Sequence, residues 1–189
     1  MLSQRPRWKS QAGYTVIEMV IVGAICITGM VMAIPMTMRM VQSAKGDSAQ
    51  VMTATFLESG RNRAVAERRN IQLTILDDSS MQLERIEVPS GLHTVVATLQ
   101  LEDLEEFLRD PDLPDTPDVF GGLDAVNFTG TAPVMFTSDG SLIDSAGDVT
   151  NATIFIQKPD FPDTIRAVTV SGVTGMMRSW KWRGTSWLQ

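Results

Sequence analysis

The sequence contains one cysteine, Cys26, and one histidine, His93, in 189 residues. A lone cysteine cannot form a disulfide within the chain, so cysteine usage says nothing about the redox compartment. His93 lies in a strand-like stretch without neighbouring metal ligands, and we expect it to be structural. The chain also lacks a glycine-rich phosphate loop and a Gly-x-Ser-x-Gly turn. These absences predict a protein that is not an enzyme and that needs no cofactor and no metal.

Positive charge is also scarce, because 16 Lys and Arg face 22 Asp and Glu, which gives a net charge of −6. A general nucleic-acid-binding protein is usually basic overall, so the balance disfavours that class. The charges are unevenly distributed. A basic leader precedes an acidic middle, which holds 14 acids between residues 102 and 163, and the chain ends in a basic tail with no acid after residue 163.

The most informative segment is the apolar run Val16–Ile34, in which Glu18 is the only charged residue. As a helix its 19 residues would be roughly 28 Å long, close to the thickness of a bilayer hydrocarbon core. The basic residues Arg5, Arg7 and Lys9 before it favour a cytoplasmic amino terminus. In such a helix we expect Cys26 to be a small apolar residue facing lipid or a neighbouring helix.

Two ordinary explanations leave Glu18 unexplained. A secretory signal peptide would have an uninterrupted apolar core followed by a small-residue cleavage site, for which Val31-Met32-Ala33 is a poor match. A plain membrane anchor fits the length. However, a carboxylate inside a bilayer costs on the order of 2–3 kcal/mol or more and usually has a partner.

The residues Gly13-Tyr14-Thr15-Val16-Ile17-Glu18 resemble the processing site of prepilins, and Pro35 lies at that family's usual helix-kink position. The resemblance implies that a prepilin peptidase removes a leader of residues 1–13 by cutting between Gly13 and Tyr14. It also implies that the peptidase methylates the new amino group and that the apolar segment is retained. One departure is the first mature residue, which is most often Phe or Met in that family and is Tyr14 here.

This resemblance suggests a role for Glu18. Cleavage would expose a cationic amine on Tyr14, and the carboxylate of Glu18 in one subunit would pair with the Tyr14 amine of its neighbour. A buried charge is costly alone and tolerable when paired. Glu18 is therefore expected to set the register of assembly with other pilins or pseudopilins.

Helical periodicity continues beyond Pro35. We expect one helix from about Tyr14 to Arg69, bent or locally frayed between Pro35 and Gly46. Its transmembrane and assembly half would cover residues 14–35, and its amphipathic half would cover residues 36–70. The predicted apolar stripe is Val41, Ala44, Ala49, Met52 and Phe56, and the predicted polar side includes Asp47, Ser48, Glu58 and Arg61.

Residues 71–189 predict a β-rich head, because short β-branched runs alternate with turn residues. The expected strands are Ile71–Leu76, Met81–Val88, His93–Leu101, Ala152–Gln157 and Arg166–Gly172, with a hairpin over Pro133–Ile143 that turns at Asp139-Gly140. A short helix is predicted at Glu102–Arg109. The segment after it, Asp110–Asp124, contains five acids that could suggest a calcium site, and we call it the acidic loop. Their spacing does not match an EF-hand, so we expect a solvated surface loop.

Three head segments are similar to the GspH/FimT group of prepilin-like proteins. They are Arg63–Asn70 before the first strand, the Met135–Leu142 hairpin, and Ala167–Arg178 near the end. The resemblance implies a pilin-like α+β fold, with a long amino-terminal helix packed on a β-sheet-rich head. It also implies a minor pilin or minor pseudopilin in the bacterial inner membrane, with a periplasmic head. A type II secretion pseudopilus and a type IV pilus both fit.

The tail interleaves basic and aromatic residues: Arg178, Trp180, Lys181, Trp182 and Arg183. Cations on phosphates and rings on bases can grip nucleic acid, so DNA binding for natural transformation is the alternative function. The competing interpretation is an ordinary half-buried edge strand. In it Trp180 and Trp182 face one side, while Lys181 and Arg183 face the other.

Overall fold

The computed structural model describes residues 13–189, which divide into two compact units on either side of the boundary between Arg39 and Met40. One helix, α1 (Val16–Glu67), contributes to both units. Its bounds lie within two residues of the prediction. The helical backbone is continuous at Pro35 and at Gly46, so of the two predicted alternatives, a bend or local fraying, the fraying is wrong. The missing N–H of a proline removes one intrahelical hydrogen bond, and the helix continues past it here.

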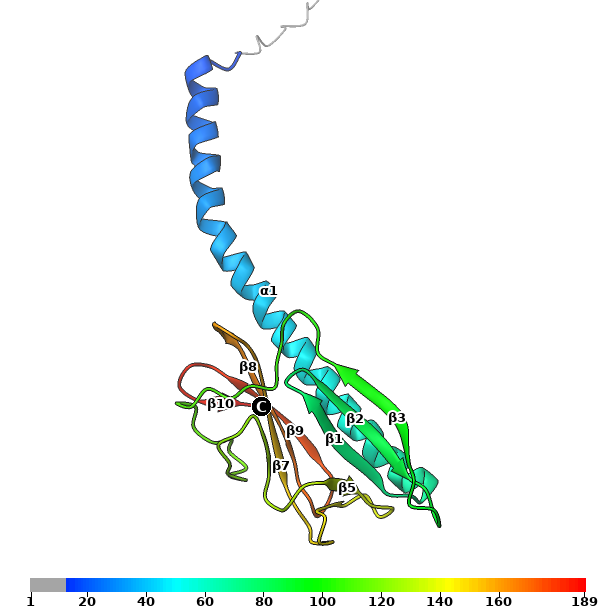
Figure 1. Ribbon diagram of the computed structural model, residues 1–189. Helices are drawn as coiled ribbons and strands as arrows, with labels where there is room; N and C mark the ends of the chain where they lie inside the picture. The colour runs from blue at the N-terminus through cyan, green and yellow to red at the C-terminus, as the bar shows by residue number, and fades with distance from the viewer. Residues whose placement is uncertain (1–12) are drawn as a thin grey trace, which may run out of the picture. The chain divides into compact units, whose positions relative to one another are not determined.

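The second unit contains two antiparallel five-stranded sheets (Figure 1). The first has the order β3-β2-β1-β5-β6 and the second the order β10-β9-β8-β7-β4. The first sheet consists of β1 (Ile71–Asp77), β2 (Ser80–Ile86), β3 (His93–Gln100), β5 (Val134–Phe136) and β6 (Leu142–Ile143). The second consists of β4 (Val126–Phe128), β7 (Ala152–Lys158), β8 (Phe161–Val170), β9 (Met177–Trp182) and β10 (Trp187–Leu188). The α+β fold class predicted from the sequence is confirmed.

Most of the predicted strands are present, with differences in the bounds of β8 and additional short strands. The predicted hairpin is present, because Phe136 pairs with Leu142 across a turn in which Gly140 has a φ of 85°. The strand β8 begins at Phe161, five residues before the predicted start. The three-residue strand β4 was not predicted, because so short a run carries no periodic signal.

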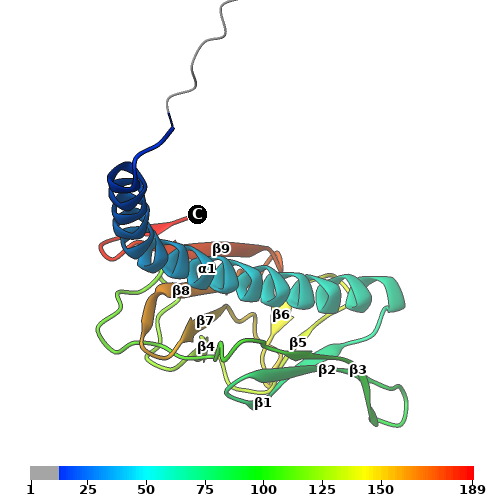
Figure 2. The same cartoon turned by 90° about the horizontal axis from the view of Figure 1, so that it is seen from above.

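The second half of α1 lies along the strands of both sheets (Figure 2). A Cβ at Gly46 would approach the carbonyl oxygen of Thr164 in β8 to 2.7 Å, and one at Gly60 would approach Leu83 in β2 to 2.9 Å. These glycines therefore permit close helix–sheet contact. The buried helix face consists of Gly46, Ala49, Gln50, Thr53, Phe56, Leu57, Gly60 and Ala64.

The predicted apolar stripe is only partly correct. Ala49 and Phe56 are buried, whereas Val41 and Ala44 are exposed. On the predicted polar side, Asp47 contacts the second sheet, as described below. The buried face of α1 therefore combines the large apolar residues Phe56 and Leu57 with small and polar side chains, and it coincides with the predicted stripe only in part.

The predicted helix at Glu102–Arg109 is absent, and a turn takes its place. Asp103 and Leu104 have positive φ values of 59° and 64°, which no α-helix accommodates. Glu106 then pairs with Gln157 at the end of β7 as an isolated antiparallel bridge. The acidic loop that follows contacts the second sheet, since Trp187 donates its indole N–H to the carbonyl of Pro114 at 3.1 Å. Within residues 13–189 no group of three or more His, Cys, Asp or Glu is arranged to hold a metal.

Candidate functional site

The first unit presents an apolar helix surface to its surroundings. Among the described residues, α1 is the one helix long and apolar enough to cross a membrane, and none of its apolar stretch is buried within the chain. Its large apolar side chains, such as Ile17, Val20 and Ile27, are exposed, as is Cys26. A contiguous exposed apolar surface of this kind is typical of a segment that contacts a membrane or other proteins.

The proposed cleavage site lies just before this helix. Gly13 and Tyr14 have no regular secondary structure, and the side chain of Tyr14 is 80% exposed. The residues before Gly13, including the basic leader, lie outside the described residues. The peptide bond between Gly13 and Tyr14 is therefore in an exposed, non-helical stretch, as a protease substrate requires.

Glu18 and Thr15 are joined by hydrogen bonds at the amino-terminal end of α1. The backbone N–H and the hydroxyl of Thr15 donate to Glu18 Oε2 at 2.8 Å and 3.0 Å. The N–H of Glu18 lies 3.4 Å from Thr15 Oγ1. This arrangement is a capping box, in which a Thr at the helix start and a Glu three residues later satisfy each other's backbone donors. The Thr-x-x-Glu spacing of this cap is present in the sequence, but the cap was not predicted from it.

The capping box leaves part of the carboxylate free. Both hydrogen bonds from Thr15 go to Oε2, and within the described part of the chain Glu18 Oε1 accepts none. One oxygen thus remains for a partner from another molecule. Pairing with the Tyr14 amine of a neighbour stays a prediction, as does the assembly role of Pro35, which lies within the continuous helix.

The tail forms β9, which lies between β8 and β10, so the predicted edge position is only approximate. The side chain of Trp180 is buried and donates its indole N–H to Thr169 Oγ1 at 3.0 Å. It packs with Phe155 and Trp187. The ring of Trp182 lies 5.2 Å from that of Trp187, on the same side of the strand. These tryptophans form a small core on the face of the sheet.

Two of the three tail cations are neutralised within the chain. Arg178 pairs with Asp118 of the acidic loop, and Lys181 lies 2.9 Å from Asp47 of α1. Arg183 is exposed and takes part in no ion pair among the described residues. The sequence alternative of DNA binding therefore lacks the open row of cations that phosphate contacts need.

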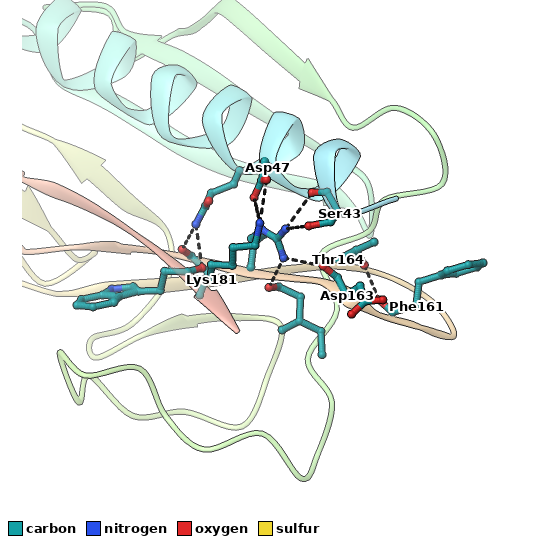
Figure 3. A network of polar contacts seen from close by, with 11 residues as sticks. Ser43, Asp47, Phe161, Asp163, Thr164 and Lys181 are labelled. Carbon is teal, nitrogen blue, oxygen red and sulfur yellow. Dashed lines mark hydrogen bonds and ion pairs between the residues drawn. The ribbon is translucent and has the colours of Figure 1, made fainter. Parts of the chain in front are cut away.

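A polar network joins α1 to the second sheet at the first helical turns of the second unit (Figure 3). The guanidinium of Arg166 in β8 is fully buried and donates to Asp47 Oδ1 at 2.7 Å. It also donates to the backbone oxygens of Ser43, Asp163 and Ile165 at 2.8–2.9 Å, and to Ser43 Oγ at 3.1 Å. All of its hydrogen-bonding directions are therefore occupied.

Asp47 is the shared counterion of this network, since Lys181 also binds it at 2.9 Å and 3.0 Å. Partial burial acts to raise the pKa of Asp47, but the hydrogen bonds and charges of Lys181 and Arg166 outweigh it and hold that pKa below its usual value. No local sequence pattern indicates this contact, because Asp47 and Arg166 are far apart in the chain.

Comparison with known proteins finds similar solved structures at low sequence identity. No family model and no curated protein matches the chain. Among solved structures, the type IV minor pilin FimU of Pseudomonas aeruginosa is 15% identical, with 82% of this chain and 98% of that chain covered and a TM-score of 0.47. The minor pseudopilin EpsH from the Type 2 Secretion System of Vibrio cholerae is 12% identical, with 72% and 97% covered and a TM-score of 0.47.

Proposed function

We propose that this chain is a minor pilin or minor pseudopilin, a structural subunit that initiates or caps a filament. The observation that carries the proposal is the position of Glu18. It is the only charged residue of the apolar segment Val16–Ile34 of α1, and it lies five residues after a glycine in a prepilin-like junction. A two-sheet head at the other end of α1 supplies the globular part of such a subunit.

In this proposal the inner membrane holds the precursor by residues 14–35, with the leader in the cytoplasm and the head in the periplasm. Prepilin peptidase cuts after Gly13 and methylates Tyr14. The exposed, non-helical position of this bond supports its role as a substrate. The partners are then the peptidase, the lipid bilayer and the other pilins or pseudopilins of the filament.

The capping box refines the role of Glu18. Before assembly Thr15 satisfies one carboxylate oxygen, which reduces the cost of holding the acid in an apolar helix. During assembly the other oxygen accepts the Tyr14 amine of the adjacent subunit. The same side chain thus begins the helix and selects the correctly staggered neighbour.

Two measurements test the proposal. Intact-mass analysis of the protein from native membranes should find a chain that begins at Tyr14 and carries one added methyl group. A different amino terminus would refute processing by a prepilin peptidase, and the assembly mechanism with it.

The second measurement separates the two roles of Glu18. Glu18→Gln keeps the capping box, because Gln also serves at that position, but it removes the charge. We expect Glu18→Gln to insert in the membrane and be processed, yet fail to enter filaments, and we expect the same of Glu18→Ala. Incorporation of Glu18→Gln at the wild-type level would show that Glu18 only caps the helix and that its charge has no role in assembly.

The proposal covers both a type IV pilus and a type II secretion pseudopilus. Cross-linking of the full-length protein in its native membrane, followed by identification of the attached subunits, distinguishes them. Secretion of exoproteins and surface piliation in a deletion strain provide the matching functional readouts.

A further inference from the structure

The turn that replaces the predicted helix places two side chains against their usual preference. In residues 102–106, here called the strap, Leu104 is 73% exposed, whereas Glu105 is 1% exposed. A glutamate is almost never fully buried unless it is paired, and an exposed leucine forgoes the free energy of burial. The strap therefore holds an apolar residue outside and an acid inside.

The buried carboxyl of Glu105 has no close partner. Neither of its oxygens receives a hydrogen bond within the described part of the chain. The charged groups around it are Lys45 on α1, Asp103 in the strap, Lys158 on β7 and Arg166 on β8. Lys45 is already paired with Asp103 at 2.9 Å, and Arg166 with Asp47.

The environment of Glu105 therefore favours its neutral form. Burial raises the pKa of Glu105 to about 7, against the opposing attraction of Lys158 and Arg166. A carboxylate without hydrogen bonds is costly to keep inside a protein, so loss of the proton creates a force that drives the side chain toward water.

The backbone conformation of the strap is strained, which would favour such a movement. Asp103 and Leu104 both adopt the left-handed conformation, which is disfavoured for residues that carry a Cβ. The ends on either side are fixed. Leu101 and Phe107 are buried in the core, and Glu106 exchanges two hydrogen bonds with Gln157 at 2.9 Å and 3.0 Å. A strained turn between two fixed ends can rearrange without unfolding its surroundings.

A place for Leu104 lies beside the strap. A groove of about 290 Å³ is lined by residues of α1, among them Val41, Ala44 and Met52, and by Glu102 and Asp103 of the strap. Its walls are mostly apolar, and it is large enough to hold a leucine side chain. Filling it would bury apolar surface that is now exposed.

We propose that the strap is a proton-controlled switch with two positions. With Glu105 protonated, the acid lies inside, Leu104 lies outside and the groove on α1 is open. When Glu105 releases its proton to water, its carboxylate turns to solvent and Leu104 turns into the groove. This exchange relieves the left-handed strain and replaces an unpartnered buried acid with a buried leucine. The inference does not depend on the proposed assembly role.

The test measures access to the groove in the full-length protein in detergent micelles. With Cys26→Ser as background, one variant carries Ala44→Cys in the groove and a reference variant carries Val173→Cys in an exposed turn. Alkylation by an uncharged maleimide is measured at pH 6 and pH 8, and the groove rate is divided by the reference rate. We expect this ratio to fall at least fivefold at pH 8.

Two variants assign the effect. Glu105→Met is similar in size and cannot ionise, so the ratio should stay at its pH 6 value at both pH values; Glu105→Gln provides the same test if the methionine variant does not fold. Glu106→Gln, a change of the neighbouring carboxyl, should preserve the fall. An unchanged ratio in the parent, or an equal fall in Glu105→Met, would overturn the switch.

Discussion

Removal of Asp47 should lower the free energy of unfolding of the second unit by more than the removal of an exposed surface ion pair does. Asp47→Ala leaves the buried guanidinium of Arg166 without its only carboxylate in the described chain, although four hydrogen bonds to neutral acceptors remain. Breaking a fully buried pair costs about 3–5 kcal/mol. The side chain of Asp47 is 47% exposed, so water can partly replace it.

We therefore expect Asp47→Ala to lower the free energy of unfolding by about 2 kcal/mol, with the larger part due to the uncompensated charge. Asp47→Asn keeps an acceptor for Nε of Arg166 and should lose roughly 1 kcal/mol. The matched control is Asp103→Ala, which breaks the pair with Lys45 in which both partners are substantially exposed. Its cost should be below about 0.5 kcal/mol.

The assay is denaturant unfolding of the full-length chain in micelles, followed by tryptophan fluorescence. Three of the four tryptophans lie between residues 180 and 187, close to the network, so their emission reports its loss. Equal midpoints for Asp47→Ala and Asp103→Ala would refute the reasoning, because the buried arginine would then need no counterion. A thermal melt should show the same order, with Asp47→Ala lower than the parent by about 4–8 °C.

Three further predictions use the same unfolding assay. Gly46→Ala should cost roughly 1–3 kcal/mol because its Cβ would meet the Thr164 carbonyl at 2.7 Å, whereas Gly29→Ala has open space and should not destabilise. Arg68→Gly should stabilise by about 1 kcal/mol, since Arg68 follows the last residue of α1 with a φ of 50°; a loss of stability would show that its side chain makes a needed contact. The pKa of Glu105 is raised from 4.5 to about 7, so between these pH values the folded chain binds more protons than the unfolded chain. Stability should therefore fall as pH rises through this window, and a pH series on Glu105→Met should lack that fall.

The parts of the fold that the sequence predicts are those with long local patterns. The 52-residue helix and strands such as β1 and β7 carry repeated apolar or β-branched residues, and these signals survive any tertiary context. The Asp139-Gly140 turn is encoded locally as well. The long helix, the β-rich head and the hairpin were accordingly predicted nearly at their observed bounds.

The incorrect predictions share a different cause. Glu102–Arg109 has good helix formers, but the chain must turn there to bring Glu106 beside Gln157, and this long-range pairing overrides local propensity. The buried face of α1 was misplaced for a related reason. Close contact with β8 selects Gly46, and a buried arginine selects Asp47, so small and polar residues mark the interface.

The candidate site shows the same division. The prepilin-like junction is a local motif and could be recognised from Gly13 to Glu18 without a structure. The state of the tail cations could not, because Arg178 and Lys181 are neutralised by Asp118 and Asp47, which come from distant segments. The sequence of the tail alone therefore suggests more unpaired positive charge than the fold leaves available to a ligand.

The acidic middle and the basic tail are therefore best understood together. Asp118 lies in the loop between β3 and β4, yet it binds both Arg178 and Thr169 on the second sheet. Lys181 is neutralised from a different segment, since it pairs with Asp47 of α1. Internal pairing with the loop and with the helix therefore removes two of the three cations that the tail would otherwise offer to a nucleic acid, and Arg183 is the one that takes part in no ion pair among residues 13–189.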